Sequence, residues 1–332
     1  MGKKTMDEKL KKLKNILGEK AKENEPLGRY TTLKIGGPAD LFFDAKTIDE
    51  LTEAITSARK LGIPYFMLGG GTNILIGDRG IRGLVVKNST DRIAIIGAKG
   101  RFEGGENKGT VYVEADSGVI MNKLVRFTIE EGLGGLEMQL GLPGTVGGAM
   151  YMNSKWTQPE GYVGDAVYQA TILNGKNEVK VVPRSYFQFG YDKSILQEIP
   201  DVVLRVVFIL KREPKEKLWE VANSVMAYRR GTQPQGVKSP GCTFRNISKS
   251  EAMSIPTPNH TTSAGFLIDH AGLKGTRVGD AQISPVHANF IVNLGSSSAS
   301  DVVKLIEIIR AKVKQQFGVT LKEEIVRVGE FT

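Results

Sequence analysis

Apolar residues recur at helical spacing in five stretches of the chain, and the segments between them show the alternation or the short apolar runs typical of β-strands. In the stretch 47–61, for example, Leu51 and Ile55 fall on one face, Thr47 can cap the first turn, and Gly62 follows the last. Helices are predicted at the Lys-rich start of the chain and over residues 47–61, 119–131, 219–230 and 299–317. Strands are predicted over residues 30–35, 39–44, 64–68, 74–76, 83–87, 111–115, 166–174, 178–183 and 202–211, with a polar, Gly-rich hairpin between 97 and 109.

The composition is that of an ordinary globular protein. Apolar residues make up 40% of the 332 positions and charged residues 24%, and this length allows two or three domains of about 100–150 residues. The first of these begins strand, helix, strand, Gly-rich loop, strand, which is the order of a small α/β unit. No apolar run of about 18 residues occurs and no apolar segment follows the charged start, so we expect neither a membrane span nor a signal peptide.

Positive charge is in excess and unevenly spread. Lys and Arg outnumber Asp and Glu by 45 to 36, and the first 24 residues hold eight Lys against four acids. Such an excess fits a nucleic-acid-binding arm or a solvated amphipathic helix, and the lack of interleaved aromatic residues favours the helix. We therefore expect no nucleic-acid partner, while the positive field favours anionic substrates such as nucleotides.

Cysteine and histidine usage argues against a metal site. The single cysteine, Cys242, excludes an internal disulfide framework and any multi-cysteine site. The three histidines, His260, His270 and His287, have no ligand spacing with one another or with clustered carboxylates. We expect no metal and a reducing, cytoplasmic setting.

A loop of three glycines lies between two predicted strands. It consists of Gly69, Gly70, Gly71, Thr72 and Asn73. Glycine accepts positive φ and has no Cβ, so such a loop can bring its backbone N–H groups against a phosphate, although a plain structural turn explains it as well. It is neither a Walker loop, which ends in Gly-Lys-Ser/Thr, nor a Rossmann loop, which opens a helix.

A second Gly-rich stretch spans residues 132–153. It contains Pro143, Gly144, Thr145, Gly147 and Gly148. A segment so dense in glycine needs unusual backbone angles or the close approach of something flat or phosphorylated. Tightly packed turns account for only part of it.

Three segments together carry a family resemblance: residues 35–40 (IGGPAD), 68–73 (LGGGTN) and 141–148 (GLPGTVGG). They resemble the flavin domain of the UDP-N-acetylenolpyruvoylglucosamine reductase family, within the vanillyl-alcohol-oxidase-like superfamily. The resemblance implies FAD, with the first Gly-rich loop on its diphosphate and the second on its isoalloxazine side. It also implies an α+β protein in which two α/β subdomains form the FAD-binding domain. Its predicted parts are an N-terminal helix (1–24), the FAD-binding domain (25–212, divided at about 90) and a C-terminal α+β substrate-binding domain (213–332).

The stretch 187–196 resembles the family pattern Phe-Gly-Tyr-Arg-x-Ser-Ile, with Tyr191 and Ser194 matching. Asp192 occupies the position of the Arg, which in the family helps hold the enolpyruvyl carboxylate. This reversal of charge should oppose the binding of a carboxylate. Lys193 is adjacent, but neighbouring residues of a strand point to opposite faces.

Two further resemblances concern catalytic groups. Residues 233–246 resemble the family stretch in which a Ser after a Gly donates a proton to the substrate, and Cys242 occupies that position. A thiol, with a pKa of about 8.5, is mostly protonated near neutral pH and is a better donor than an alcohol, although a lone cysteine is more often a small buried hydrophobe. Residues 318–329 resemble the terminal family segment with a catalytic Glu, which aligns with Glu324.

The resemblance implies a reaction in two halves. NADPH reduces FAD, and a hydride then passes to the β-carbon of UDP-N-acetylglucosamine enolpyruvate, giving UDP-N-acetylmuramate for peptidoglycan. Cys242 is the implied acid and Glu324 the group that polarises the site. Candidate contacts to this UDP-sugar are Tyr191, Ser194, Lys238, Arg245 and Asn246. A monomer is the family expectation.

Two other classes of function stay open from the sequence alone. One is a flavin oxidase of the same superfamily, which would share both Gly-rich loops. The other is a diverged paralogue that binds FAD or a UDP-sugar without reducing it, a reading that Asp192 favours.

Overall fold

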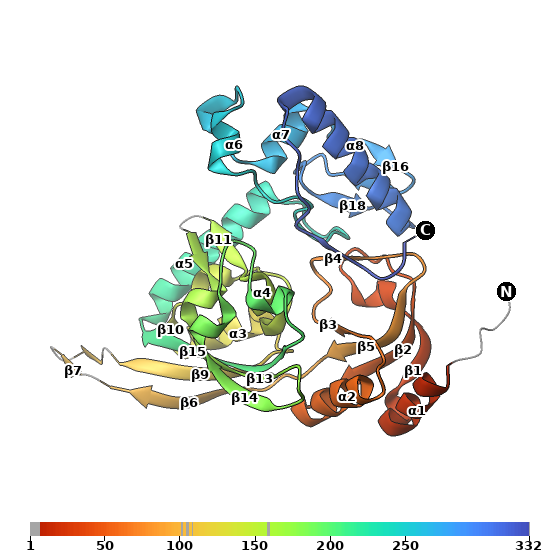
Figure 1. Cartoon of the computed structure of the whole chain (residues 1–332). Helices are drawn as coiled ribbons and strands as arrows, with labels where there is room; N and C mark the ends of the chain where they lie inside the picture. Colours follow the sequence, from red (N-terminus) through yellow and green to blue (C-terminus); the bar gives the residue numbers. More distant parts are fainter. Residues whose placement is uncertain (1–6, 101, 104–105, 108, 158–159, 332) are drawn as a thin grey trace.

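Three packed parts make up the protein. The computed structural model describes residues 7–100, 102–103, 106–107, 109–157 and 160–331. A mostly parallel sheet comes from the N-terminal part of the chain, an antiparallel sheet from the middle, and a small helical and sheet unit from the C-terminal part (Figure 1). The predicted α+β class is confirmed.

The N-terminal part is a four-stranded sheet with two helices. Its elements are α1 (Glu8–Leu17), β1 (Lys22–Pro26), β2 (Pro38–Ala45), α2 (Ile48–Lys60), β3 (Tyr65–Leu68), β4 (Ile74–Ile76) and β5 (Ile81–Asn88). The strand order is β1-β2-β5-β3, with β2, β5 and β3 parallel and β1 antiparallel to β2. Apolar residues of α1 and α2 form one cluster with alternate residues of β2 and β5, so both helices cover the same face of the sheet. Thr47 caps α2 as predicted, accepting a hydrogen bond from the N–H of Glu50 at 3.2 Å.

The start of the chain differs from the prediction in two ways. The helix described there ends at Leu17 instead of continuing to residue 24. It packs on the N-terminal sheet and α2 through Leu10, Leu13 and Leu17. The strand predicted over 30–35 is wrong. Residues Leu27–Tyr30 form a short 3₁₀ turn, and a hydrogen bond from Thr31 Oγ1 to the Ile35 carbonyl at 3.1 Å closes an irregular loop instead. The sheet takes β1 as its edge strand, a polar segment whose sequence shows no apolar alternation.

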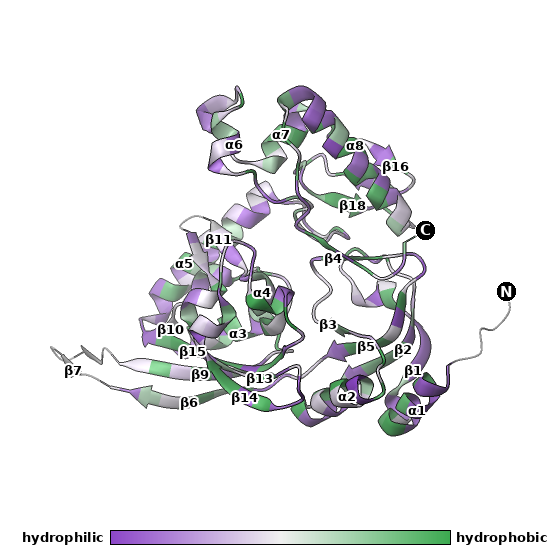
Figure 2. Ribbon diagram, in the orientation of Figure 1, coloured by the Kyte–Doolittle hydropathy of each residue, from purple (hydrophilic) through white to green (hydrophobic). Residues whose placement is uncertain are grey.

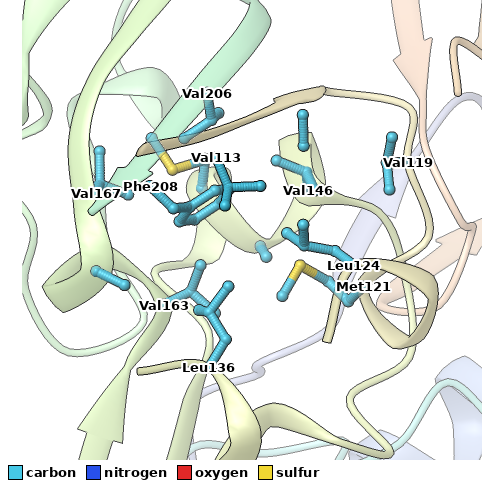
Figure 3. Close-up of a cluster of buried hydrophobic side chains, with 14 of the residues drawn as sticks. Val113, Val119, Met121, Leu124, Leu136, Val146, Val163, Val167, Val206 and Phe208 are labelled. Atoms are coloured by element: carbon cyan, nitrogen blue, oxygen red, sulfur yellow. The ribbon is translucent and has the colours of Figure 1, made fainter. Parts of the chain in front are cut away.

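The middle part is an antiparallel sheet packed against helices. Its strands and helices are β6 (Ile93–Lys99), β7 (Phe102–Glu103), β8 (Glu106–Asn107), β9 (Thr110–Asp116), α3 (Met121–Glu130), β10 (Leu133–Gly134), α4 (Val146–Met152), β11 (Lys155–Thr157), β12 (Glu160–Tyr162), β13 (Val167–Leu173), β14 (Val179–Pro183) and β15 (Val202–Arg212). The strand order is β14-β13-β15-β9-β6, and β10 pairs with the end of β15. Val113, Val206 and Phe208 of the sheet meet Leu124 of α3 and Val146 of α4 in a buried cluster (Figure 3). Each of these five side chains is at most 1% exposed, so they form a close-packed core.

Helix α5 (Lys215–Thr232) packs with this middle part. Leu218 and Ala222 belong to its buried cluster, although the sequence placed the boundary before the helix, at residue 213. In the packing, the C-terminal unit therefore begins after α5. The division of functions between the parts stays a prediction.

The C-terminal part is a three-stranded sheet with helices around it. Its elements are α6 (Lys249–Met253), α7 (Ala264–His270), β16 (Arg277–Val278), β17 (Ala281–Ile283), β18 (Ile291–Asn293), α8 (Ala299–Phe317) and β19 (Val326–Val328). Helix α8 has the predicted bounds because both ends carry sequence caps: Ser298 and Asp301 form a capping box, and Gly318 takes the left-handed conformation. Hydrophilic and hydrophobic residues alternate around α8, which buries its apolar stripe in the C-terminal core (Figure 2).

The short 3₁₀ turns complete the secondary structure: η1 (Gly18–Lys20), η2 (Leu27–Tyr30), η3 (Glu137–Gln139), η4 (Val163–Ala166), η5 (Arg184–Phe187), η6 (Ile195–Gln197) and η7 (Pro258–His260). Within the described ranges, no helix is long and apolar enough to cross a membrane.

The end of the chain returns to the N-terminal part. Strand β19 pairs in parallel with β4, which directly follows the first Gly-rich loop. Asp78, at the turn after β4, accepts hydrogen bonds from the N–H groups of Ala299 and Ser300 at 2.7 and 3.0 Å and so caps α8. These contacts hold the C-terminal part against the N-terminal sheet.

Candidate active site

A cavity of about 1000 Å³ lies where the three parts meet. It is lined by both Gly-rich loops, by the turn around Tyr191 and Asp192, by residues of α5, and by Cys242 and Glu324 of the C-terminal part. All ten candidate cofactor residues line it: Gly69, Gly70, Gly71, Thr72, Asn73, Pro143, Gly144, Thr145, Gly147 and Gly148. Loops that are about 70 residues apart in sequence therefore form one wall.

The two Gly-rich loops approach each other so closely that only glycine fits at the contact. A Cβ on Gly70 would lie 2.7 Å from the Cα of Gly144, and a Cβ on Gly69 would lie 2.7 Å from Thr145 Oγ1. Gly71 and Gly144 also have positive φ, at 64° and 108°. Glycine is therefore required at these positions, both for the close approach of the two loops and for the positive φ.

Backbone donors on these loops are left for a ligand. Among the described residues, no group accepts a hydrogen bond from the N–H of Gly70, Gly71 or Thr72. The N–H groups of Gly144 and Thr145, on the facing loop, are likewise unpartnered there. Buried backbone N–H groups are nearly always paired, so this cradle fits a ligand rich in acceptor oxygens, such as a dinucleotide diphosphate.

Cys242 lines the cavity from an extended segment of the C-terminal part. This segment bridges to Phe290 through Cys242 itself and to Glu323 through Phe244. Asn289 fixes it: the Phe244 N–H donates to Asn289 Oδ1 at 2.9 Å, and Asn289 Nδ2 donates to the Phe244 carbonyl at 2.8 Å. Burial, and then the charge of Glu324, raise the pKa of the Cys242 thiol, which keeps it protonated at neutral pH.

Glu324 is tied to both sides of the cavity through its backbone. Its N–H donates to the Thr243 carbonyl at 2.8 Å, and its carbonyl accepts from Asn73 Nδ2 at 3.2 Å. Burial, reinforced by the charge of Asp192, raises the pKa of the Glu324 carboxyl to about 8. The acid is therefore mostly neutral at pH 7 and able to donate a hydrogen bond.

Asp192 sits in a tight turn rather than on a strand. Its φ is 49°, and the Gly190 N–H donates to the Lys193 carbonyl at 2.9 Å across the turn. The side chain is 5% exposed, and its Oδ2 has no hydrogen-bond partner in the described structure. Burial raises the pKa of this carboxyl, while Lys155 and Arg245 oppose the rise.

The candidate substrate residues divide into two groups. Tyr191 and Asn246 line the cavity. The other three do not: Ser194 is buried and donates to the Tyr151 carbonyl at 2.8 Å, Lys238 is exposed at the surface, and Arg245 is half-buried outside the lining. Arg245 acts on the site only through its charge, which opposes the raised pKa values of Glu324 and Asp192.

Sequence reasoning missed four residues of the site: Lys155, Trp156, Arg229 and Asn289, all of which line the cavity. Residues 286–293 (VHANFIVN), which include Asn289, also resemble the family, so that resemblance could have pointed to it. Lys155 and Trp156 follow the second Gly-rich stretch without a recognisable motif. Arg229 stacks on Trp156, with its guanidinium carbon 4.7 Å from the ring centroid.

No group of three or more His, Cys, Asp or Glu within the described ranges is arranged to hold a metal ion. The polar groups of the cavity include the backbone donors of the two loops, a thiol, two carboxyls of raised pKa and two cations.

Two family models match the chain. The FAD binding domain matches residues 39–182, and the C-terminal domain of UDP-N-acetylenolpyruvoylglucosamine reductase matches residues 233–328. The second match begins just after α5, at the boundary indicated by the packing.

Whole-chain relatives agree with these matches. UDP-N-acetylenolpyruvoylglucosamine reductase of Caldanaerobacter subterraneus subsp. tengcongensis is 37% identical over 96% of this chain and 97% of its own, and that of Bacillus pumilus is 35% identical over 97% and 99%. The crystal structure of UDP-N-acetylenolpyruvylglucosamine reductase from Thermus caldophilus superposes with a TM-score of 0.72 at 34% identity, covering 92% of this chain and 98% of that one. A vanillyl-alcohol-oxidase-type flavoprotein from Myceliophthora thermophila shares the fold at a TM-score of 0.54 and 10% identity, covering 93% of this chain and 85% of that one.

Proposed function

The chain belongs to the UDP-N-acetylenolpyruvoylglucosamine reductase family, and from that premise we propose how its own residues carry out the reaction. The protein is an FAD-dependent, NADPH-driven oxidoreductase that reduces UDP-N-acetylglucosamine enolpyruvate to UDP-N-acetylmuramate in peptidoglycan synthesis. The steps below concern residues that line one cavity.

The two Gly-rich loops hold FAD. The unpartnered N–H groups of Gly70, Gly71 and Thr72 would donate to its diphosphate, and Gly144 and Thr145 lie on the facing loop. When bound, FAD accepts a hydride from NADPH and supplies a hydride to the β-carbon of the enolpyruvyl group. The loops bind and orient the cofactor and take no other part.

Cys242 delivers the proton that completes the reduction. Addition of hydride to the β-carbon leaves an electron pair that is delocalised over the α-carbon and the carboxylate, and a proton on the α-carbon then gives the saturated lactyl ether. The Cys242 thiol has a pKa raised by burial, so it carries that proton throughout the neutral range. NADPH and one solvent proton supply the two reducing equivalents and the proton in each cycle.

Glu324 acts as a neutral hydrogen-bond donor beside the developing negative charge. Its pKa of about 8 keeps the carboxyl protonated below that pH, and the backbone bonds to Thr243 and Asn73 fix its position. A preorganised neutral donor stabilises an enolate without the repulsion that a carboxylate would add.

We also place the enzyme in the cytoplasm, as a monomer acting on a UDP-sugar. The single cysteine is needed as a free thiol, which favours reducing surroundings. The UDP-sugar would occupy the C-terminal side of the cavity, where Tyr191 and Asn246 line it.

The observation that carries the assignment is the meeting of Cys242, Glu324 and both Gly-rich loops at one cavity. It is tested by anaerobic stopped-flow absorbance of the flavin-loaded enzyme, reduced by NADPH and mixed with UDP-N-acetylglucosamine enolpyruvate. We expect prompt reoxidation of the flavin in the wild type and in Cys242→Ser, and a loss of about 10²–10⁴-fold in Cys242→Ala.

The NADPH half of the reaction serves as the internal control, because it needs no proton from Cys242 and should be unchanged in all three proteins. Flavin that is reduced but reoxidised only by oxygen would indicate an oxidase instead. Bound flavin that NADPH cannot reduce would indicate a binding protein. Full activity of Cys242→Ala would remove Cys242 from the mechanism.

A further inference from the structure

The cavity needs a positive charge to bind the carboxylate of the substrate. The substrate carries a carboxylate beside the reacting carbon, and the group at the family's arginine position is the buried carboxyl of Asp192, whose Oδ2 is unpartnered among the described residues. Burying a substrate carboxylate beside this acid is costly unless a cation pairs with it. Another residue must therefore supply the positive charge.

Two nearby cations are poorly placed to do so. Lys193 is exposed and pairs with Glu198 at 2.8 Å, and it does not line the cavity. Arg245 also lies outside the lining. Neither Lys193, which follows Asp192 in sequence, nor Arg245, whose charge acts on Asp192, therefore replaces the family's arginine.

Lys155 and Arg229 are the cationic residues among those that line the cavity in the described structure. Arg229 stacks on Trp156, and a Cβ on Gly141 would lie 2.9 Å from its Cδ, so its stem is held against the protein. Burial lowers the pKa of Arg229, and the charge of Cys242 opposes this lowering. Arg229, whose buried Nε has no hydrogen-bond partner among the described residues, therefore acts on the thiol, while Asp192 and Glu324 are not among the groups that shift its pKa.

Lys155 lines the cavity beside Tyr191. It belongs to β11, which pairs with β12, and its Nζ is 3.3 Å from the centroid of the Tyr191 ring, the residue before Asp192. Burial lowers the pKa of Lys155, while Asp192, Glu324, Glu160 and Cys242 all oppose this lowering in that order. Lys155 thus lines the cavity next to the turn that carries Asp192, and the charges of Glu324 and Cys242 also act on it.

We propose that Lys155 is the carboxylate-binding cation of this enzyme, donating hydrogen bonds from Nζ to the enolpyruvyl carboxylate in place of the family's arginine. Asp192 is a positioning residue that balances the ammonium charge beside Tyr191 before substrate enters. This inference rests on the proposed reductase function.

The location of Cys242, the proposed proton donor, supports this role of Lys155. The carboxylate is bonded directly to the α-carbon that receives the proton of Cys242, so its cation has to lie near Cys242 and Glu324. The charges of both act on Lys155, whose Nζ stands over the Tyr191 ring, and a cation held by a ring face keeps N–H donors that can turn toward a ligand. The proposed cation thus lies on β11, while the turn that carries the family's arginine position holds an acid.

The test measures equilibrium binding to the oxidised, flavin-loaded enzyme, by calorimetry or by perturbation of the flavin absorbance. Two ligands are compared: UDP-N-acetylglucosamine enolpyruvate, and UDP-N-acetylglucosamine, which lacks the carboxylate. The wild type should prefer the carboxylate ligand, and Lys155→Met should lose about 10- to 100-fold of this preference, the usual range for a hydrogen bond to a charged group.

Three comparisons make the result specific. Lys155→Met keeps an unbranched apolar side chain against Tyr191, and its flavin content and its affinity for UDP-N-acetylglucosamine should match the wild type. Lys155→Arg should restore most of the preference, and Lys193→Met, which removes the neighbouring surface cation, should leave it unchanged. If Lys155→Met does not retain flavin, Lys155→Gln is measured in its place.

An unchanged preference in Lys155→Met, or an equal loss of affinity for both ligands, would overturn the proposal, since the second result indicates only a structural role. Failure of the reductase function is seen separately: wild-type enzyme reduced by NADPH would not be reoxidised by the enolpyruvyl substrate under anaerobic conditions. Prompt reoxidation together with an unchanged preference would reject Lys155 alone.

Discussion

Replacement of Glu324 by glutamine tests the raised pKa on which the proposed donor role depends. The pKa of Glu324 is raised from 4.5 to about 8, chiefly by burial, so the folded protein holds a proton that the unfolded chain has already released between these two pH values. Stability from this group is thus fully present below pH 4.5, declines as pH rises, and is lost above pH 8. Glutamine has nearly the same shape and cannot ionise.

The size of the effect follows from the difference of about 3.5 pKa units, which corresponds to about 5 kcal/mol at 1.36 kcal/mol per unit. Glu324 faces the cavity, where entering water reduces the cost of its charge, so we expect about 2–5 kcal/mol. The free energy of unfolding of Glu324→Gln, relative to the wild type, should rise by this amount from pH 4.5 to pH 8 and then level off.

Urea unfolding of the flavin-loaded proteins, followed by circular dichroism at pH 5, 6, 7, 8 and 9, measures the difference, with equal m-values in both proteins as the condition for comparing them. Glu307→Gln is the matched control, because Glu307 is an exposed carboxylate on α8 and should give a difference near zero at every pH. A difference between Glu324→Gln and wild type that does not change with pH would refute the reasoning. It would show that Glu324 ionises normally and is an anion during catalysis.

Three further predictions follow from contacts described above. Gly70→Ala forces a Cβ to within 2.7 Å of the facing loop, so purified protein should retain less than about a tenth of its flavin, whereas Gly231→Ala, with no atom within 4 Å, should retain all of it by absorbance. Asp78→Ala removes the acceptor of two N–H groups in the first turn of α8 and should lower the free energy of unfolding by about 1–2 kcal/mol in urea titrations. Leu13→Ala should cost about 2–5 kcal/mol, because Leu13 is 0% exposed, while Ile16→Ala on the same helix, at 49% exposed, should cost below about 1 kcal/mol; equal losses would contradict docking of α1.

Much of the fold follows from local sequence, and the exceptions have physical causes. Helix α8 has the predicted bounds because its caps and its apolar stripe agree. Strand β1 could not be found, since Lys22–Pro26 is polar and is held as a strand by pairing with β2. The predicted strand at 30–35 failed because the apolar residues Leu33 and Ile35 are buried in the C-terminal core from an irregular loop, and local alternation does not show which element will cover a side chain.

The site was predictable only in parts. The Gly-rich loops are visible in the sequence, because close backbone contact requires consecutive glycines, whereas Cys242 and Glu324 were identified through family resemblance and by no local pattern. Lys155 was missed because a lysine on a short strand has no distinguishing sequence context. Its role depends on Tyr191 and Asp192, which reach it only when the middle part of the chain is folded.

The return of the chain to β4 explains how the proposed catalytic groups, so far apart in sequence, are joined to the proposed cofactor loop. The side chain of Asn73 donates to the Glu324 carbonyl across a separation of 251 residues, and the Val326 N–H donates to the Asn73 carbonyl at 2.9 Å. The Glu324 N–H in turn donates to Thr243, the residue after Cys242. A continuous series of main-chain bonds therefore joins the loop that would hold FAD to the neutral acid and to the thiol. Because backbone bonds fix positions more tightly than long side chains, the fold sets the distance from the first Gly-rich loop to Cys242, and the longer side chain of the proposed carboxylate-binding lysine is left to adapt to the substrate.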